Sequence, residues 1–204
     1  MPKRKSNWMQ EHVSDEWVKK ANLEGWRSRA AFKLLEIFER DKLAYSGMTT
    51  VDLGAAPGGW SQVVKKYCGE TGVVFALDIL DMEPLHGVKV IKGDFTEEST
   101  LNILQGELGG KEVDLVISDM APNISGVKTV DQARWLHLAE LALDFACENL
   151  KNDGHMIIKC FEGAGSDEFR REVRNKFGKV LIRKPKASRD RSSEFFLVAL
   201  NKFR

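Results

Sequence analysis

The chain has 204 residues, of which 43% are hydrophobic and 30% charged. This composition is typical of one globular domain and argues against a disordered or fibrous protein. The sequence holds no run of about 18 apolar residues, which excludes a membrane-spanning helix, and its basic start lacks the apolar segment of a secretory signal. The three cysteines Cys68, Cys147 and Cys160 are far apart and in no metal-ligand spacing. We therefore expect reduced thiols, no metal site and a cytoplasmic protein without a membrane partner.

The net charge of +1 hides an uneven distribution. Residues 1–40 carry a net charge of +3, residues 41–169 a net charge of −11, and residues 170–204 a net charge of +9. Charge separation of this kind indicates interaction surfaces even in a nearly neutral chain. The basic run 183–191 is open to two interpretations, a solvated loop or part of a nucleic-acid-binding face formed where the two basic ends meet.

In chain order, residues 7–43 are expected to be mostly helical, and short strands then alternate with helices. The clearest helix is 130–150, where apolar residues recur every three or four positions. Alternation of strands and helices predicts an α/β fold with a parallel sheet and helices on both faces. The predicted strands are 49–54, 72–79, 88–95, 113–120 and 155–161.

Two late apolar runs, 179–184 and 193–200, are about nine residues apart with no helix between them. This spacing predicts an antiparallel hairpin at the edge of the sheet. No linker or internal repeat divides the chain, so we expect a single domain over 1–204. Its basic parts are an N-terminal segment, 1–30, and the C-terminal hairpin, 179–200.

The turn after the first predicted strand is rich in glycine. Gly54, Gly58 and Gly59 permit backbone conformations and close approaches that a Cβ atom would prevent, and the helix that follows can point main-chain amides at a ligand. The spacing fits neither a Walker A loop nor the G-x-G-x-x-G pattern. The turn therefore indicates a ligand-binding loop of another kind.

Four aspartates, Asp52, Asp78, Asp94 and Asp119, lie at or near the ends of four predicted strands. Ligands of open α/β sheets bind at this edge, where Asp78 could accept from ribose hydroxyls and Asp94 from an adenine amine. Any one of these aspartates could instead be a turn or cap residue. Because the set repels polyphosphates, it favours a neutral or cationic nucleoside such as S-adenosylmethionine. Trp60 could pack near the adenosine or be an ordinary core aromatic.

Four further residues could carry chemistry. Lys159 lies within an apolar strand, where lysine is seldom fully buried without a partner, although a lysine at the strand edge could reach water. Lys33 lies in a helical stretch and could be an exposed surface lysine. Asp119 lies in the S-D-M-A-P-N turn, and Glu194 opens the last strand.

These motifs together resemble the FtsJ/RrmJ (RlmE) family of S-adenosylmethionine-dependent ribose 2′-O-methyltransferases. The resemblance runs nearly end to end, and it is strongest to bacterial members that act on large-subunit ribosomal RNA. No motif position departs from the family pattern, apart from the small variation Cys160 beside Lys159. The matching motifs are W-x-Q-E-H (8–12), SRAAFKL (28–34), VDLGAAPGGWSQ (51–62), SDMAPN-x-SG (118–126), K-x-F-x-G (159–163) and RKP-x-ASR-x-RSSE (183–194).

The resemblance implies a Rossmann-like class I methyltransferase fold with seven strands, mostly parallel, and an antiparallel last strand. It implies methylation of a uridine 2′-hydroxyl in large-subunit ribosomal RNA at a late stage of ribosome assembly, by a monomer. Its catalytic tetrad falls on Lys33, Asp119, Lys159 and Glu194. Its cofactor residues fall on Gly58, Trp60, Asp78, Asp94 and Asp119.

The chemistry implied by the tetrad is general-base catalysis. Lys159 would accept the hydroxyl proton as a neutral amine, a form that burial and Lys33 favour. Asp119 would orient the amine, and Glu194 would hold Lys33 or a ribose hydroxyl. Alternatives are methylation of a transfer-RNA anticodon loop and a non-catalytic RNA-binding role in ribosome assembly. Candidate RNA-binding residues are Lys3, Arg4, Lys5, Trp8, Arg27, Arg29, Arg183, Lys184, Lys186, Arg189 and Arg191.

Overall fold

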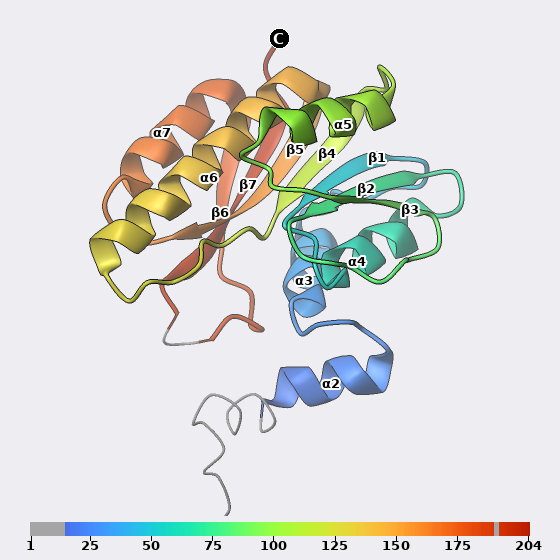
Figure 1. The fold of residues 1–204 in the computed structure, drawn as a ribbon, viewed down its shortest axis with the longest axis horizontal. Coiled ribbons are helices and arrows are strands. Elements are labelled where there is room, and N and C mark those ends of the chain that lie inside the picture. The colour runs from blue at the N-terminus through green and yellow to red at the C-terminus, as the bar shows by residue number, and fades with distance from the viewer. Residues whose placement is uncertain (1–14, 190–191) are drawn as a thin grey trace, which may run out of the picture.

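A single seven-stranded sheet forms the centre of the computed structural model, which describes residues 15–189 and 192–204 (Figure 1). The strand order is β3-β2-β1-β4-β5-β7-β6. Every strand of the sheet except β7 runs in the same direction, and β7 is antiparallel to both of its neighbours. The strands are β1 (Thr49–Leu53), β2 (Val73–Asp78), β3 (Val88–Lys92), β4 (Val113–Ser118), β5 (Leu150–Phe161), β6 (Phe177–Arg183) and β7 (Glu194–Lys202).

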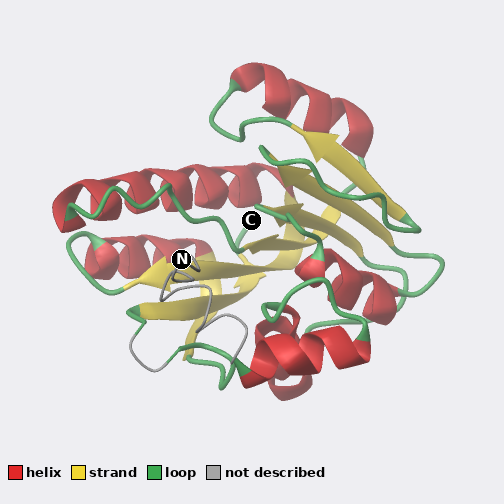
Figure 2. Cartoon of the chain, turned by 60° about the horizontal axis from the view of Figure 1, so that its bottom comes forward, coloured by secondary structure: helices red, strands yellow, loops and turns green. Residues whose placement is uncertain are grey.

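Helices cover both faces of this sheet (Figures 1 and 2). One face packs on α5, α6 and α7 through residues such as Leu104, Trp135 and Phe169. The other packs on α3 and α4, where Phe38 and Val63 are buried. The described helices are α2 (Glu16–Glu24), α3 (Ala31–Asp41), α4 (Gly59–Cys68), α5 (Glu98–Leu108), α6 (Lys128–Asn149) and α7 (Ser166–Lys176).

The alternation of side chains along the strands decides which residues face α3 and α4. Neighbouring side chains of a strand point to opposite faces. Leu53 contributes to the core under α5, α6 and α7, so Asp52 faces α4. Ile158 and Cys160 belong to that same core, so Lys159 between them points toward α3 and α4. The polar residues of the carboxyl-end edge therefore share one face of the sheet.

The expected α/β architecture is confirmed, including all seven strands and the antiparallel hairpin of β6 and β7 at the sheet edge. The strand predicted at 155–161 is longer than expected, because β5 begins at Leu150. Within residues 15–43, the helical expectation for 7–43 is met by α2 and α3, which a turn at Gly25 separates. Residues 8–12, which carry the first family motif, lie outside the described residues.

The N-terminal helix α2 is tied to the rest of the domain by a small apolar cluster of Ala21, Phe32 and Ala187. Asp15 caps the helix, since its side chain accepts from the main-chain N–H of Trp17 at 3.0 Å. This packing brings the N-terminal region beside the β6–β7 loop. Within the described ranges no helix is both long and apolar enough to cross a membrane.

Candidate active site

Lys159 and Asp119 form a buried ion pair at the carboxyl edge of the sheet. The register pairs Ser118 with Ile158, which places the residue after β4 beside Lys159 of β5. Lys159 is 8% exposed, and its Nζ lies 2.9 Å from Asp119 Oδ1. The same ammonium group donates to the main-chain carbonyl of Asp119. These two contacts to Asp119 fix the position of the Lys159 nitrogen. Because the side chain is buried, Lys159 is not a strand-edge lysine that extends into water.

Lys33 and Glu194 form a second buried ion pair. Lys33 lies in the first turn of α3 and is 8% exposed, so it is not the surface lysine of the alternative interpretation. Its Nζ lies 2.6 Å from Glu194 Oε1 and 5.5 Å from the centroid of the Phe196 ring. Phe196 is also the cross-strand partner of Lys159 in the register of β5 and β7, so this residue neighbours both lysines.

The charge state of Glu194 reflects both pairs. Burial by itself would raise the pKa of Glu194, but the charge and hydrogen bond of Lys33, with the charge of Lys159, outweigh burial and lower the pKa. The two lysines thus act on one carboxylate. The structure brings the four residues of the predicted tetrad together as two ion pairs.

The glycine turn lies against the Asp119 segment. A Cβ atom on Gly54, whose φ is +77°, would lie 2.7 Å from Met120 Cγ and 2.9 Å from the Met120 nitrogen. Gly58, with φ of +104°, precedes the first residue of α4. The turn therefore holds the start of α4 close to the end of β4, with the first amides of the helix directed toward the sheet edge.

Asp78 connects the two loops on either side of this edge. Its Oδ2 accepts from the main-chain N–H of Ala56 at 2.8 Å, and its Oδ1 accepts from that of Leu80 at 2.8 Å. Each carboxylate oxygen has two acceptor positions, so one on each remains for a ligand hydroxyl. The exposed apolar side chains of Ile79 and Leu80 follow directly and offer a surface for a flat base.

Asp94 lies two residues beyond the end of β3. Its Oδ1 accepts from both the main-chain N–H and the hydroxyl of Thr96, at 2.9 and 2.7 Å. These hydrogen bonds lower the pKa of Asp94. The described contacts engage only Oδ1, so Oδ2 can accept from an exocyclic amine.

Asp52 does not line the crevice as the sequence suggested, because its side chain is fully buried within β1. Its Oδ2 accepts from the Ser61 hydroxyl at 2.6 Å, while its Oδ1 has no partner among the described residues. Burial raises the pKa of Asp52 to about 7, with smaller contributions from the charges of Asp119 and Asp78. The hydrogen bond from Ser61 opposes this rise. The carboxylates thus form one repulsive cluster that a cation would relieve.

We expect the buried Asp52 to make the protein less stable as pH rises. Its pKa is raised in the folded state, so the folded protein binds more protons than the unfolded one between about pH 4 and pH 7. Stability should fall through that window, and Asp52→Asn should remove the fall while keeping an acceptor for Ser61. Urea midpoints of both proteins at pH 5 and pH 8 measure this effect. Parallel pH dependence in the two proteins would contradict it.

Trp60 is packed in the core under α4. It is 3% exposed, its indole N–H donates to the carbonyl of Ala30 at 2.8 Å, and its ring lies 5.7 Å from that of Phe196. This burial agrees with the alternative of a core aromatic, and a contact between the indole and an adenosine stays a prediction. As the second residue of α4, Trp60 can still offer a main-chain N–H to a ligand.

Several cations proposed for RNA binding are already engaged within the protein. Arg29 pairs with Asp15 and donates to the carbonyl of Ala187. Arg183 donates from Nε to Asp41 at 2.9 Å. Lys184 donates to main-chain carbonyls of the β6–β7 region, and Arg27 donates to three carbonyls described below. These four are therefore engaged within the protein, and RNA binding by them stays a prediction.

Of the remaining candidates, Lys186 is exposed and Arg189 is partly exposed. Both lie in the β6–β7 loop beside α2, with Arg189 Nη2 4.0 Å from an Asp15 carboxylate oxygen. A surface hollow of about 460 Å³ lies between Trp17, Arg29, Lys186 and Arg189. Within the described residues, Arg29 of the basic N-terminal segment and these two residues of the β6–β7 loop therefore line the same hollow. Lys3, Arg4, Lys5, Trp8 and Arg191 lie outside the described residues.

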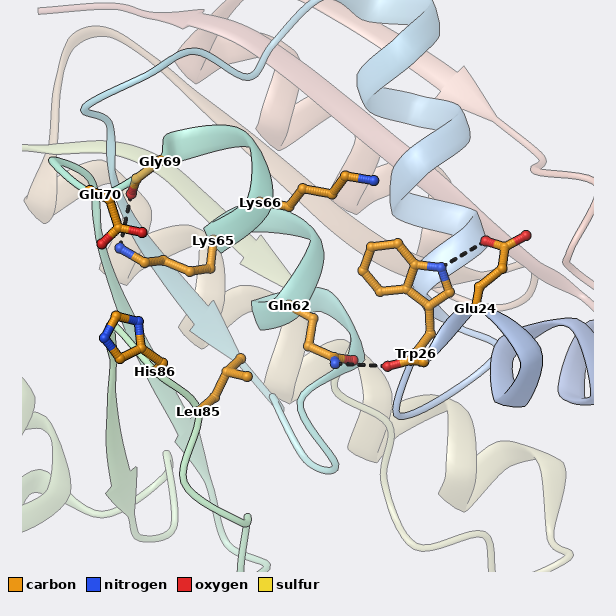
Figure 3. Close-up of a pocket in the computed structure, with 10 residues that line it drawn as sticks. Glu24, Trp26, Gln62, Lys65, Lys66, Gly69, Glu70, Leu85 and His86 are labelled. Atoms are coloured by element: carbon orange, nitrogen blue, oxygen red, sulfur yellow. Dashed lines mark hydrogen bonds between the residues drawn. The ribbon is translucent and has the colours of Figure 1, made fainter.

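A larger hollow, of about 540 Å³, lies along the outer side of α4 (Figure 3). It includes none of the predicted site residues, and several of its polar groups are already satisfied. Lys65 donates to the carbonyls of Gly69 and Gly72, and the Trp26 indole donates to Glu24. We therefore place the active site at the sheet edge and not in this hollow.

Sequence reasoning missed the polar residues in the first turn of α4. Ser61 bonds the buried Asp52, and Gln62 bonds the segment that precedes α3. Both residues belong to the motif GGWSQ, and their position directly after the glycines is the feature of the sequence that could have identified them. Among the described residues no cluster of three metal-ligating side chains suited to a metal ion is found.

The sheet order and the polar groups at its carboxyl edge define a methyltransferase of the Rossmann-like class. A solved ribosomal RNA methyltransferase from Plasmodium falciparum has this fold, with a TM-score of 0.76 and 25% identity, covering 87% of this chain and 99% of that one. A hemolysin structure from Lactococcus lactis, 16% identical with a TM-score of 0.60, shares the fold alone; it covers 87% of this chain and 88% of that one.

The family model described as FtsJ-like methyltransferase matches residues 26–202. The chain is 59% identical over 192 residues to the ribosomal RNA large subunit methyltransferase E of Alkalilimnicola ehrlichii, covering 94% of this chain and 92% of the relative. It is 56% identical over 195 residues to the protein of that name from Methylobacillus flagellatus, covering 96% and 94%. The chain belongs to the FtsJ-like methyltransferase family.

Proposed function

We propose that this protein transfers a methyl group from S-adenosylmethionine to the ribose 2′-hydroxyl of a uridine in large-subunit ribosomal RNA, at a late stage of ribosome assembly. The observation that carries the proposal is the group of two buried lysine–carboxylate pairs beside the glycine turn. The names of the relatives in Alkalilimnicola ehrlichii and Methylobacillus flagellatus support ribosomal RNA as the substrate.

The residues at the sheet edge fit a cationic nucleoside cofactor. Asp78 keeps an acceptor position for each ribose hydroxyl, Asp94 keeps one oxygen for the adenine amine, and Gly58 and Trp60 contribute main chain at the start of α4. The mutual repulsion of the carboxylates around Asp52 would be relieved by a positive ligand. The cofactor would supply a methyl group activated by its sulfonium.

Lys159 is placed to remove the proton of the acceptor hydroxyl. Two directions around its nitrogen are taken by the carboxylate and carbonyl of Asp119. A lysine nitrogen has three such directions, so in the neutral amine the lone pair can occupy the third and face the hydroxyl. Asp119 thereby orients the base, and it also borders the cofactor residues.

Lys33 and Glu194 would position the acceptor ribose. The carboxylate of Glu194 is kept ionised by the charge and hydrogen bond of Lys33 and can accept from a ribose hydroxyl. Aligning the hydroxyl oxygen with the reacting methyl group can contribute roughly 7–11 kcal/mol to catalysis. In this proposal the pair of Lys159 and Asp119 removes the proton, and the pair of Lys33 and Glu194 positions the ribose.

Lys186 and Arg189 are expected to bind RNA phosphates. Reversing both charges, Lys186→Glu with Arg189→Glu, should weaken RNA binding and reduce the slope of log affinity against log salt by about 0.7 for each phosphate that the protein no longer neutralises. Filter binding across a salt series measures the slope. Arg171→Glu, on the exposed face of α7, is the matched control. An unchanged slope in the double variant would favour the solvated-loop interpretation.

The function is tested with labelled S-adenosylmethionine and three substrates: purified large ribosomal subunits, naked ribosomal RNA and transfer RNA. We expect label in ribosomal RNA, and a 2′-O-methyluridine at the mapped position. Label in transfer RNA alone would favour an anticodon-loop enzyme, and the absence of turnover on every substrate would favour a non-catalytic assembly role.

A further inference from the structure

Arg27, in the segment between α2 and α3, binds main-chain carbonyl groups of two different loops. Its Nη1 donates to the carbonyl of Pro57 at 3.2 Å and to that of Glu83 at 2.6 Å. Its Nη2 donates to the carbonyl of Pro84 at 2.8 Å. Three of the five N–H groups of a guanidinium are thereby used within the protein.

The two loops are those that flank the proposed cofactor. Pro57 precedes Gly58 in the glycine turn, while Glu83 and Pro84 lie in the segment between β2 and β3, which follows Asp78. A Cβ atom on Gly58 would lie 2.9 Å from Arg27 Nη1, so the turn packs directly on the guanidinium. The Arg27 side chain therefore holds the two loops at a fixed separation. Asp78 links the same two loops through its hydrogen bonds to Ala56 and Leu80.

Gln62 fixes the main chain of Arg27 in turn. Its Oε1 accepts from the Arg27 N–H at 2.7 Å, and its Nε2 donates to the carbonyl of Gly25 at 3.1 Å. Figure 3 shows Gln62 extending from α4 toward the segment that carries Trp26. Gln62 thus supports Arg27 from α4, the helix that directly follows the glycine turn.

We infer that Arg27 is a positioning residue for the cofactor site and not a phosphate ligand for RNA. A guanidinium is suited to this because it is a rigid, planar group with several donors in fixed directions. A lysine has one nitrogen and cannot hold carbonyls of both loops in the same geometry. The inference rests on the proposed function, since it assumes S-adenosylmethionine as the ligand.

The test compares Arg27→Lys and Arg27→Ala with the wild type in calorimetric titrations with S-adenosylmethionine. We expect the dissociation constant to rise by about tenfold or more, which corresponds to a loss of about 1.4 kcal/mol or more. The KM for the cofactor should rise in parallel, while kcat at saturating cofactor stays within about threefold. Guanidinium at millimolar concentration should partly restore affinity to the alanine variant. Arg171→Ala is the matched control, and thermal unfolding verifies that each variant folds.

RNA binding separates the inference from its rival. The positioning role requires that the affinity for RNA and its salt dependence remain those of the wild type in Arg27→Ala, because this variant removes the charge that a phosphate ligand would need, whereas lysine would keep it. Unchanged cofactor affinity, or a smaller salt slope for RNA, would overturn the inference. A wild type that fails to bind S-adenosylmethionine would contradict the proposed function and this inference with it, whereas equal binding by wild type and variant would contradict the inference alone.

Discussion

Replacing Lys159 by alanine should lower the rate of methyl transfer by about 10²–10⁴-fold, the usual contribution of a positioned base, while S-adenosylmethionine still binds. The physical reason is that its nitrogen is the part of the ion pair with Asp119 that can face a hydroxyl. Single-turnover rates with labelled cofactor and a separate titration of cofactor binding measure the two effects. Near wild-type methylation would exclude Lys159 as the base.

Three further variants provide rates of methyl transfer with which the loss in Lys159→Ala can be compared. Lys33→Ala and Glu194→Ala should also reduce the rate by more than about tenfold, but less than Lys159→Ala, because they act on position and not on the proton. Lys89→Ala is the matched control, since Lys89 is likewise a strand lysine paired with a carboxylate, Glu107 at 2.9 Å, on an exposed surface. Equal losses in all four variants would indicate a structural defect.

Replacing Asp78 by alanine should have the opposite signature, a loss of cofactor affinity with RNA binding retained. Its carboxylate would lose hydrogen bonds to two ligand hydroxyls, and hydrogen bonds to charged groups contribute about 1.5–3 kcal/mol each. The main-chain N–H groups of Ala56 and Leu80 would also lose their acceptor. We expect the dissociation constant for S-adenosylmethionine to rise by about 100-fold or more, measured by calorimetric titration.

Asp81 provides the control in the same segment. Its side chain is largely exposed and pairs with Lys92 at 2.7 Å, so Asp81→Ala should leave cofactor affinity unchanged. If Asp78→Ala bound the cofactor as tightly as the wild type, the assignment of Asp78 to the ribose would be wrong. Together with Lys159→Ala, this variant separates binding from chemistry.

Much of the fold could be predicted because its signals are local. Short apolar runs separated by turn residues defined the strands, and alternation with helices implied a parallel sheet. All seven strands and the edge hairpin lie where these patterns placed them. The tetrad was also available from the sequence, through the family motifs around Lys33, Asp119, Lys159 and Glu194, and the structure brings the four together.

The features that the sequence misplaced or left open depend on distant partners. The crevice placement of Asp52 followed from its position near a strand end, but packing of α4 over β1 buries it. Trp60 stands next to the glycines, yet its side chain direction is set by Ala30 and Phe196. Neither partner is visible in the local pattern, because residue spacing says nothing of which helix face meets which strand.

The sequence by itself determined the element order, the acidic edge of the sheet and the two basic ends, since alternation, turn chemistry and charge are properties of neighbouring residues. Only the tertiary structure decided which cations are engaged within the protein. Arg183 pairs with the carboxylate of Asp41, 142 residues away, and Arg27 donates to the main-chain carbonyl of Glu83, 56 residues away. Pairing of charges is a matter of distance in space, and the fold sets that distance by packing elements that the chain keeps far apart.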